Sequence, residues 1–205
     1  VAQFGPRKNL HNTIKWFIEE FRNEDVGLVV KSNIAKNSLM DRKKLHGDLT
    51  HFLRQQGERQ CKVYLLHGDM TDAEMHSLYS NQQIHAFVSL PHGEGFGLPL
   101  FEAAYSGLPV VTVGWSGQLD FLVDTEGQEQ FYNVAFDLQP VQKEVVWDGV
   151  ITPDSMWAYA RETSAKEQMR LCYENAKAGT IVWNNTRLPE RFSTEKMYKQ
   201  FVDEI

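Results

Sequence analysis

The feature that most constrains this chain is a glycine-rich stretch that joins an apolar segment to a short helix. Gly93, Gly95 and Gly97 alternate after the strand-like run 84–90, and Pro99 stands where a helix is expected to begin. Proline suits the first helical turn because its missing N–H would have no partner there. Such a corner presents free amides at the positive end of a helix, and these bind phosphate. The stretch therefore predicts a phosphate-binding turn after a buried strand.

The residues that follow support this prediction. Leu100 and Ala104 lie one helical turn apart and can pack on one face. Gly107 is expected to end the helix, and 109–113 is apolar and β-branched, as in a buried strand. The glycines are therefore predicted to lie at a strand-to-helix corner of an α/β fold.

Two carboxylates frame this corner: Glu94 in the turn, and Glu102 eight positions later in the helix. A carboxylate repels phosphate but accepts hydrogen bonds from hydroxyl groups. Phosphate on the amides and hydroxyls on the acids together predict a nucleotide sugar as ligand. Each acid also has a simpler interpretation. Glu102 would be an ordinary acid in a first helical turn, and Glu94 a solvated loop acid.

Residues 94–111, E-G-F-G-L-P-L-F-E-A-A-Y-S-G-L-P-V-V, resemble the glutamate-x7-glutamate signature of group 1 (family 4) glycosyltransferases. The resemblance implies a GT-B fold of two Rossmann-like domains, of which the C-terminal one binds the nucleotide-diphosphate sugar. It also implies hexosyl-type transfer with retention of anomeric configuration and neither a metal nor another cofactor. The chain would be this donor-binding half.

The same resemblance assigns roles to residues of the corner. It implies that Glu102 binds the ribose hydroxyls and that Glu94 contacts the donor sugar as a catalytic group. The backbone that would hold sugar and diphosphate comprises Gly95, Phe96, Gly97 and Leu98.

Residues 3–9 are similar to the first strand and turn of the family's donor domain. Lys8 matches the lysine that binds the diphosphate, where it would stabilise the leaving group. Gln3 occupies the position of the usual arginine, which weakens the match. Arg7 either compensates, since a guanidinium suits phosphate oxygens, or is a solvated turn residue.

Three further positions lie in loops that follow predicted strands. His92 either contacts sugar or phosphate or is a loop histidine without a role. Met70 marks the loop where the nucleotide base is expected. The turn 114–120 either resembles the family's second glycine turn, near the donor sugar, or is a simple capped helix start.

The rest of the first half alternates between strand and helix. Strands are expected at 1–4, 26–30, 61–66 and 84–90. Helices are expected to follow Asn9, to run from Ser38 to Gln56, and to start at a Thr71–Glu74 capping box. This alternation predicts a parallel sheet with helices on both faces and ligands beyond the carboxyl ends of its strands. The cluster 41–44 is interpreted as a solvated helix face.

The second half is less regular. Residues 123–150 read as an irregular loop excursion with a strand-like segment at 132–136. Thr152-Pro153-Asp154 is expected to cap a long helix that ends near Gly179, and a last helix is expected from 192–195. The predicted inward residues of the long helix are Met156, Ala160, Met169, Cys172 and Ala176. The whole chain, 1–205, is predicted to be one domain with C-terminal helices from about 152.

Composition limits the alternatives. The 205 residues are 42% hydrophobic, with a net charge of −6 and a pI of about 5.6, which argues against a nucleic-acid partner bound through phosphate neutralisation. No run is long and apolar enough to span a membrane. Cys61 and Cys172 lack ligand spacing and read as buried thiols. A cytoplasmic location follows, with peripheral membrane attachment through another part left open; the sequon Asn184-Asn185-Thr186 is interpreted as chance.

The family's acceptor-binding domain has no counterpart in these residues, and the first residue is Val1 rather than Met. The fragment alone is therefore expected to be inactive, and its acceptor, whether glycan, lipid or protein, stays open. One alternative is a non-catalytic nucleotide-sugar-binding module, which Gln3 favours. A dinucleotide-dependent dehydrogenase is disfavoured, because its glycine motif follows the first strand and these glycines follow the fourth.

Overall fold

The computed structural model describes residues 1–181 and 187–203. The sequon at Asn184-Asn185-Thr186 lies outside the described residues.

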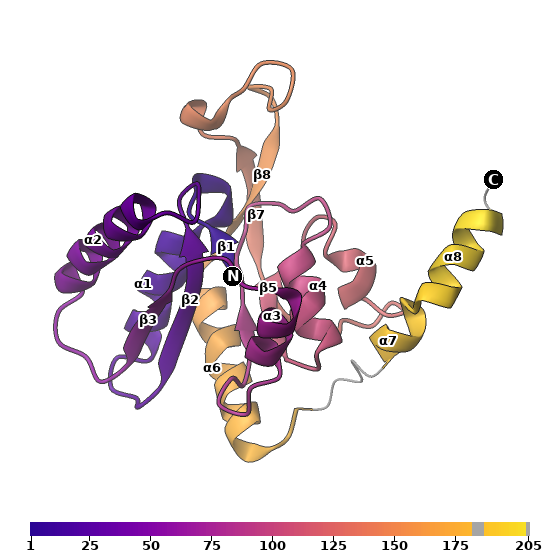
Figure 1. Cartoon of the computed structure of the whole chain (residues 1–205), viewed down its shortest axis with the longest axis horizontal. Coiled ribbons are helices and arrows are strands. Elements are labelled where there is room, and N and C mark those ends of the chain that lie inside the picture. The colour runs from indigo at the N-terminus through magenta and orange to yellow at the C-terminus, as the bar shows by residue number, and fades with distance from the viewer. Residues whose placement is uncertain (182–186, 204–205) are drawn as a thin grey trace.

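Six parallel strands alternate with helices along the first two thirds of the chain (Figure 1). β1, β2 and β3 form one three-stranded parallel sheet, and β4, β5 and β6 form another. This confirms the predicted Rossmann-like α/β class. The strands are β1 (Ala2–Gln3), β2 (Gly27–Asn33), β3 (Lys62–Leu66), β4 (Phe87–Val88), β5 (Val110–Val113) and β6 (Tyr132–Val134).

The helices between these strands follow the predicted order. They are η1 (Pro6–Lys8), α1 (Leu10–Glu20), α2 (Leu39–Gln55), α3 (Asp72–Tyr79), α4 (Leu98–Tyr105) and α5 (Leu119–Leu122). Ser38 caps α2 by accepting a hydrogen bond from the amide of Asp41. Thr71 and Glu74 form the predicted capping box of α3. Local helix-start signals were therefore sufficient to place both helices.

Strand β5 separates two apolar cores. Val111 and Val113 pack into a cluster with α1, α2 and α6 (Glu162–Ala178), whereas Val110 packs into a cluster with α3, α4 and α5. Because successive side chains of a strand point to opposite faces, these contacts put the two helix groups on opposite faces. Cys61 and Cys172 are buried within the first cluster, as predicted.

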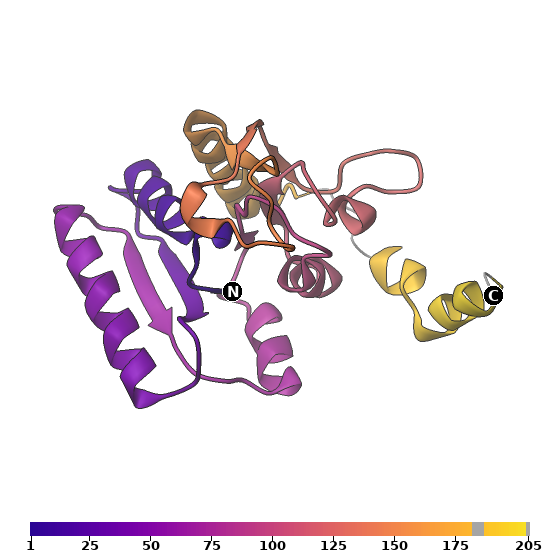
Figure 2. The same cartoon turned by 90° about the horizontal axis from the view of Figure 1, so that it is seen from above.

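The parallel strands do not make one continuous sheet. A cavity of about 650 Å³ lies between the first half of β2 and β4, lined by Val1, Leu28, Val29 and Phe87 among others. The expected strand 84–90 is a two-residue β4, and β1 is equally short, so among the described residues no ladder joins β1 to β4. Figure 2 shows β2 and β3 of the first group beside α2, seen from above.

The prediction for residues 123–160 was wrong in part. β7 (Phe136–Pro140) and β8 (Met156–Ala160) form an antiparallel hairpin, which projects from the body in Figure 1 and carries η2 (Lys143–Val145) near its tip. Thr152-Pro153-Asp154 therefore does not cap a helix, and Met156 and Ala160 belong to a strand. Trp157 and Tyr159 favour strand structure, and β7 offers them a partner.

The helix predicted there begins later. α6 starts at Glu162 and ends where Gly179 adopts a left-handed φ of 66°. Met169 and Cys172 are buried on it as predicted, whereas Ala176 is only half-buried.

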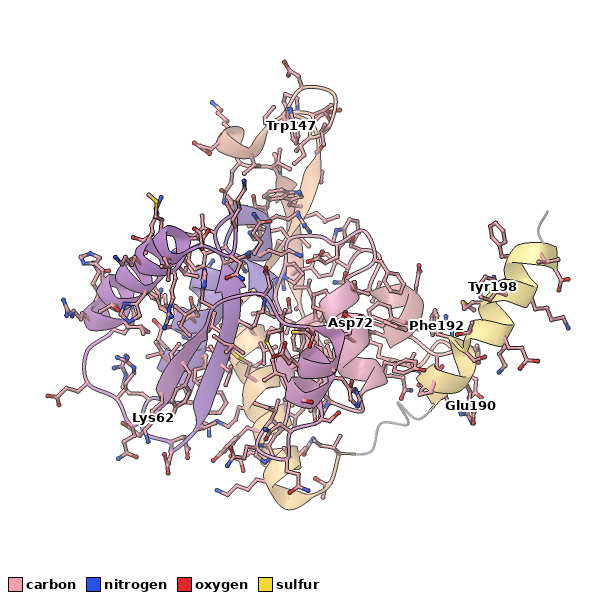
Figure 3. All side chains as sticks on the ribbon, in the orientation of Figure 1. Lys62, Asp72, Trp147, Glu190, Phe192 and Tyr198 are labelled. Atoms are coloured by element: carbon pink, nitrogen blue, oxygen red, sulfur yellow. The ribbon has the colours of Figure 1, made fainter. Side chains whose placement is uncertain are left out.

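The C-terminal segment extends away from the strands (Figures 1 and 2). α7 (Arg187–Arg191) buries Leu188 against the second core, and α8 (Thr194–Asp203) confirms the predicted last helix. Its Tyr198 is exposed, as is Trp147 at the tip of the hairpin (Figure 3). Within the described ranges, no helix is sufficiently long and apolar to cross a bilayer.

Asp41 differs from its prediction as part of a solvated face. Its side chain is 7% exposed, and its carboxylate accepts the amide N–H groups of Ile34, Ala35 and Lys36 at 2.7–3.0 Å. It also pairs with Nε2 of His67 at 2.9 Å. These backbone bonds hold the pKa of Asp41 well below its ordinary value. Asp41 therefore ties the loops after β2 and β3 together.

Asp41→Ala is expected to lower the midpoint of thermal unfolding, because three amides and His67 lose their acceptor. Asp48→Ala, at an exposed position of the same helix, is the matched control and should leave the midpoint nearly unchanged. Equal midpoints for the two variants in a calorimetric scan would contradict the role assigned to Asp41.

Candidate functional site

The turn after β1 and the corner after β4 are joined directly. The amide of His92 donates to the carbonyl of Arg7 at 2.8 Å, and Nη1 of Arg7 donates to the carbonyl of Gly93 at 2.6 Å. Two hydrogen bonds thus join segments that lie about 85 positions apart in the sequence. This confirms that loops following different parallel strands gather at one edge.

Glu94 binds both cations of the first turn. Its Oε2 accepts from Nη1 of Arg7 at 2.9 Å, and its Oε1 accepts from Nζ of Lys8. The side chain of Glu94 is 9% exposed and that of Lys8 18%, whereas that of Arg7 is 43% exposed. Glu94 is therefore not a solvated loop acid, and Arg7 is not a free turn residue. Two cations and one carboxylate leave one positive charge in excess at the corner.

The amide groups next to this charge are free. Among the described residues, the N–H groups of Phe96, Gly97 and Leu98 have no hydrogen-bond partner, while Gly97 accepts from the amides of Leu100 and Phe101. Gly97 is the N-cap of α4 with a φ of 86°, a conformation that favours glycine. Phe96 and Leu98 are exposed, and Gly95 has open space beside its α-carbon. The corner thus offers amides and positive charge to an anion.

The turn 114–120 holds the backbone of the corner in place through hydrogen bonds to Glu94. Oγ of Ser116 donates to the carbonyl of Glu94 at 2.6 Å and accepts from its amide at 3.1 Å; the amide of Gly117 donates to the same carbonyl at 3.1 Å. Ser116 holds a φ of 78°, which is uncommon for a residue with a side chain. The turn 114–120 is therefore more than a helix start, since it positions Glu94. Its proximity to a donor sugar stays a prediction.

Gly117→Ala is expected to disrupt the corner. A Cβ at this position would lie 1.8 Å from the carbonyl oxygen of Gly95, so the backbone must move. We expect a loss of about 1–3 kcal/mol in the free energy of unfolding, measured by urea denaturation. Gly47→Ala is the control, because open space surrounds that helical glycine and alanine favours a helix. A Gly117→Ala chain as stable as the wild type would refute this close approach.

His92 packs beneath the hairpin. The residue is 4% exposed, and its ring stacks on Trp157 with 5.3 Å between centroids and lies 4.4 Å from the ring of Tyr159, centroid to centroid. Nδ1 donates to the carbonyl of Ala158 at 2.8 Å, and the amide of Ala158 returns a bond to the carbonyl of His92. The ring therefore anchors β8 to the corner, a structural contact that the sequence did not reveal. Contact of His92 with a donor stays a prediction.

Burial lowers the pKa of His92, and this outweighs the opposite effect of its bond to Ala158. The unfolded chain then binds more protons than the folded one just below the ordinary pKa of about 6.5, so stability rises with pH there and falls on acidification. His92→Gln is expected to show a smaller loss of unfolding free energy between pH 7 and pH 5 than the wild type. His46→Gln, at an exposed position of α2, should keep the wild-type slope; equal slopes for all three chains would contradict the assignment.

Glu102 lies in the second turn of α4, where its Oε2 accepts a hydrogen bond from the hydroxyl of Tyr79 at 3.1 Å. The first turn of α4 contains no acidic residue, so the interpretation of Glu102 as a first-turn acid is wrong. Glu102 is half-buried, and none of the described residues donates to its Oε1. This oxygen is free to accept from a ligand.

Two residues lie apart from these contacts. Met70 is half-buried in the loop between β3 and α3, and in the described part of the chain it makes no hydrogen bond to the corner. Its assignment to the base therefore stays a prediction. Gln3 donates from Nε2 to the carbonyl of Ile34 at 2.8 Å. This bond directs its side chain to the loop after β2.

Sequence reasoning did not identify Ser116 and Tyr79 as partners of the two glutamates. The two glycines that flank Trp115-Ser116, Gly114 and Gly117, were a signal for a tight turn at Ser116. Tyr79 had no comparable signal, because its partner Glu102 is distant in sequence. Within residues 1–181 and 187–203, no group of three or more His, Cys, Asp or Glu side chains is arranged to hold a metal ion.

Comparisons with known proteins give the family of the chain. Residues 1–132 match the family described as "Glycosyl transferases group 1". A comparison with curated proteins gave no match. Among solved structures, one similar chain comes from the "Crystal structure of GtfA/B complex", with 16% identity and a TM-score of 0.36. That match covers 89% of this chain and 36% of the other, so these residues span about a third of that protein's length.

Proposed function

Because the chain belongs to the group 1 glycosyltransferase family, we propose that it is the donor-binding domain of a transferase that uses a nucleotide-diphosphate sugar. The observation that carries this proposal is the corner itself. Lys8 and Arg7, held by Glu94, lie beside the free amides of Phe96 to Leu98. Both cations and free amides bind phosphate oxygens favourably, so this combination suits a diphosphate.

The nucleoside and the sugar would occupy the two sides of the diphosphate. Glu102 presents Oε1 as an acceptor for ribose hydroxyls, and Glu94, between the two glycine turns, faces the donor sugar once phosphate oxygens engage its cations. The base would lie near the loop that contains Met70. His92 would contribute through the position of Glu94, since its backbone precedes that residue closely.

Catalysis would be electrostatic. The bond between the anomeric carbon and the diphosphate oxygen breaks, and the electron pair stays on the leaving nucleoside diphosphate. Lys8, Arg7 and the amides stabilise this charge. An acceptor hydroxyl forms the new bond to the anomeric carbon and gives its proton to an oxygen of the leaving diphosphate. The sugar passes through an oxocarbenium-like state, which Glu94 would stabilise.

The acceptor would be bound elsewhere. In the proposed arrangement a second Rossmann-like domain of a GT-B enzyme faces this corner and holds the acceptor, and transfer proceeds with retention of configuration. The 205-residue chain would then bind nucleoside diphosphates without transferring sugar.

Lys8→Ala is expected to weaken binding of the nucleoside diphosphate that the wild type prefers by about tenfold or more, since a charged hydrogen bond contributes about 1.5–3 kcal/mol. Arg7→Ala should cost less, because that side chain is 43% exposed and is screened by solvent. The measurement is calorimetric titration of the chain with UDP, GDP and ADP at two salt concentrations. The nucleosides without phosphate serve as the second ligand.

Lys15→Ala is the matched control, since Lys15 lies on α1 and pairs with Glu19 away from the corner. It should bind as the wild type does. If Lys8→Ala and Lys15→Ala bind a diphosphate equally well, the corner is not the phosphate site. If the wild type binds none of the three diphosphates, the proposed donor class is wrong.

A further inference from the structure

Tyr79 is a buried residue that the proposed chemistry has not used. It is the last residue of α3, is 4% exposed, and contacts the ring of Phe87 edge-on with 6.0 Å between centroids. Its hydroxyl reaches across to α4 and donates to Oε2 of Glu102 at 3.1 Å. A buried phenol needs such a partner, and a half-buried carboxylate needs a donor.

The electrostatics fix the direction of this bond. Burial, and then the charge of Glu102, raises the pKa of Tyr79 far above neutral pH, so the phenol keeps its proton. An ionised carboxylate only accepts hydrogen bonds, so Tyr79 must be the donor. A donor on Oε2 restrains the rotation of the carboxylate about its last side-chain bond. Oε1, which has no partner among the described residues, then has a defined position.

We propose that Tyr79 is a positioning residue for ribose recognition: its hydroxyl holds Oε2 of Glu102 so that Oε1 meets a hydroxyl of the donor's ribose. The inference rests on the proposed function, because it needs a nucleotide at this corner. Without the phenolic hydroxyl the carboxylate rotates freely and must be ordered by the ligand itself. Tyr79 thus contributes to discrimination between ribose and deoxyribose without touching either sugar.

The test compares the affinity for a ribonucleoside diphosphate with the affinity for its deoxy counterpart, and the measured quantity is the ratio of the two. UDP, GDP and ADP are titrated into the 205-residue chain beside their 2′-deoxy and 3′-deoxy counterparts, and the ratio of dissociation constants is taken for the base that binds. We expect the wild type to prefer the ribose form by about tenfold or more. Glu102→Gln should bring this ratio close to one. Tyr79→Phe, which keeps the ring, should reduce the ratio by about threefold or more.

Tyr105→Phe is the matched control. Tyr105 lies on α4, is 42% exposed, and within the described residues its hydroxyl makes no hydrogen bond, so its removal should leave the ratio unchanged. The double variant Tyr79→Phe/Glu102→Gln adds a second criterion. If Tyr79 acts through Glu102, Tyr79→Phe should not change the ratio further once Glu102 is altered.

The outcomes distinguish an error in the assignment of Glu102 from an error in the role of Tyr79. If the wild type does not distinguish ribose from deoxyribose, or if Glu102→Gln keeps the distinction, the assignment of Glu102 in the proposed function is wrong. If Glu102→Gln loses the distinction and Tyr79→Phe retains it, only the role of Tyr79 is overturned. An equal loss of affinity for both sugars in Tyr79→Phe would show a structural contribution alone, and would likewise overturn it.

Discussion

The carboxylate of Glu94 is the interaction on which the corner depends. Its side chain holds Lys8 and Arg7 from the first turn, and its backbone is held by Ser116 and Gly117 from a third segment. Placing a charged group at 9% exposure is costly unless it is paired and hydrogen-bonded, and these partners meet that cost. The pairing keeps two cations in place beside unpartnered amides. A diphosphate would meet a site whose charges are already oriented.

The order of strands and helices in the first half was predictable, because each helix start has a local cause. Ser38, Thr71 and Pro99 act within one turn of their own position, as the structure confirms. The hairpin was not predictable in this way. Thr152-Pro153-Asp154 has the residues of a helix start, yet the following segment pairs with Phe136–Pro140, and that partner is set by tertiary structure.

In the candidate site, too, local patterns were predictable and contacts between distant segments were not. The glycines and the two glutamates were visible as a pattern, whereas Tyr79, the packing of His92 under Trp157, and the burial of Asp41 depend on contacts between segments far apart in sequence. From the sequence, Asp41 is indistinguishable from a solvated helix residue, because the loop amides that donate to its carboxylate are known only from the fold. Gln3 illustrates the opposite case. Its departure from the family was visible in the sequence, but its bond to Ile34 appeared only in the fold.

The ion pairs of Glu94 also connect the two three-stranded sheets. Lys8 follows β1 of one sheet and Glu94 follows β4 of the other, so their contact bridges strands that no ladder connects. The cavity between β2 and β4 is lined by the first half of β2 and not by Lys8 or Glu94, so the ion pair joins the two half-sheets beyond the carboxyl ends of β1 and β4. Phosphate oxygens that bind Lys8 would compete with the carboxylate of Glu94 for this cation. In the proposed donor complex, diphosphate binding and the contact between the half-sheets would therefore depend on the same cations.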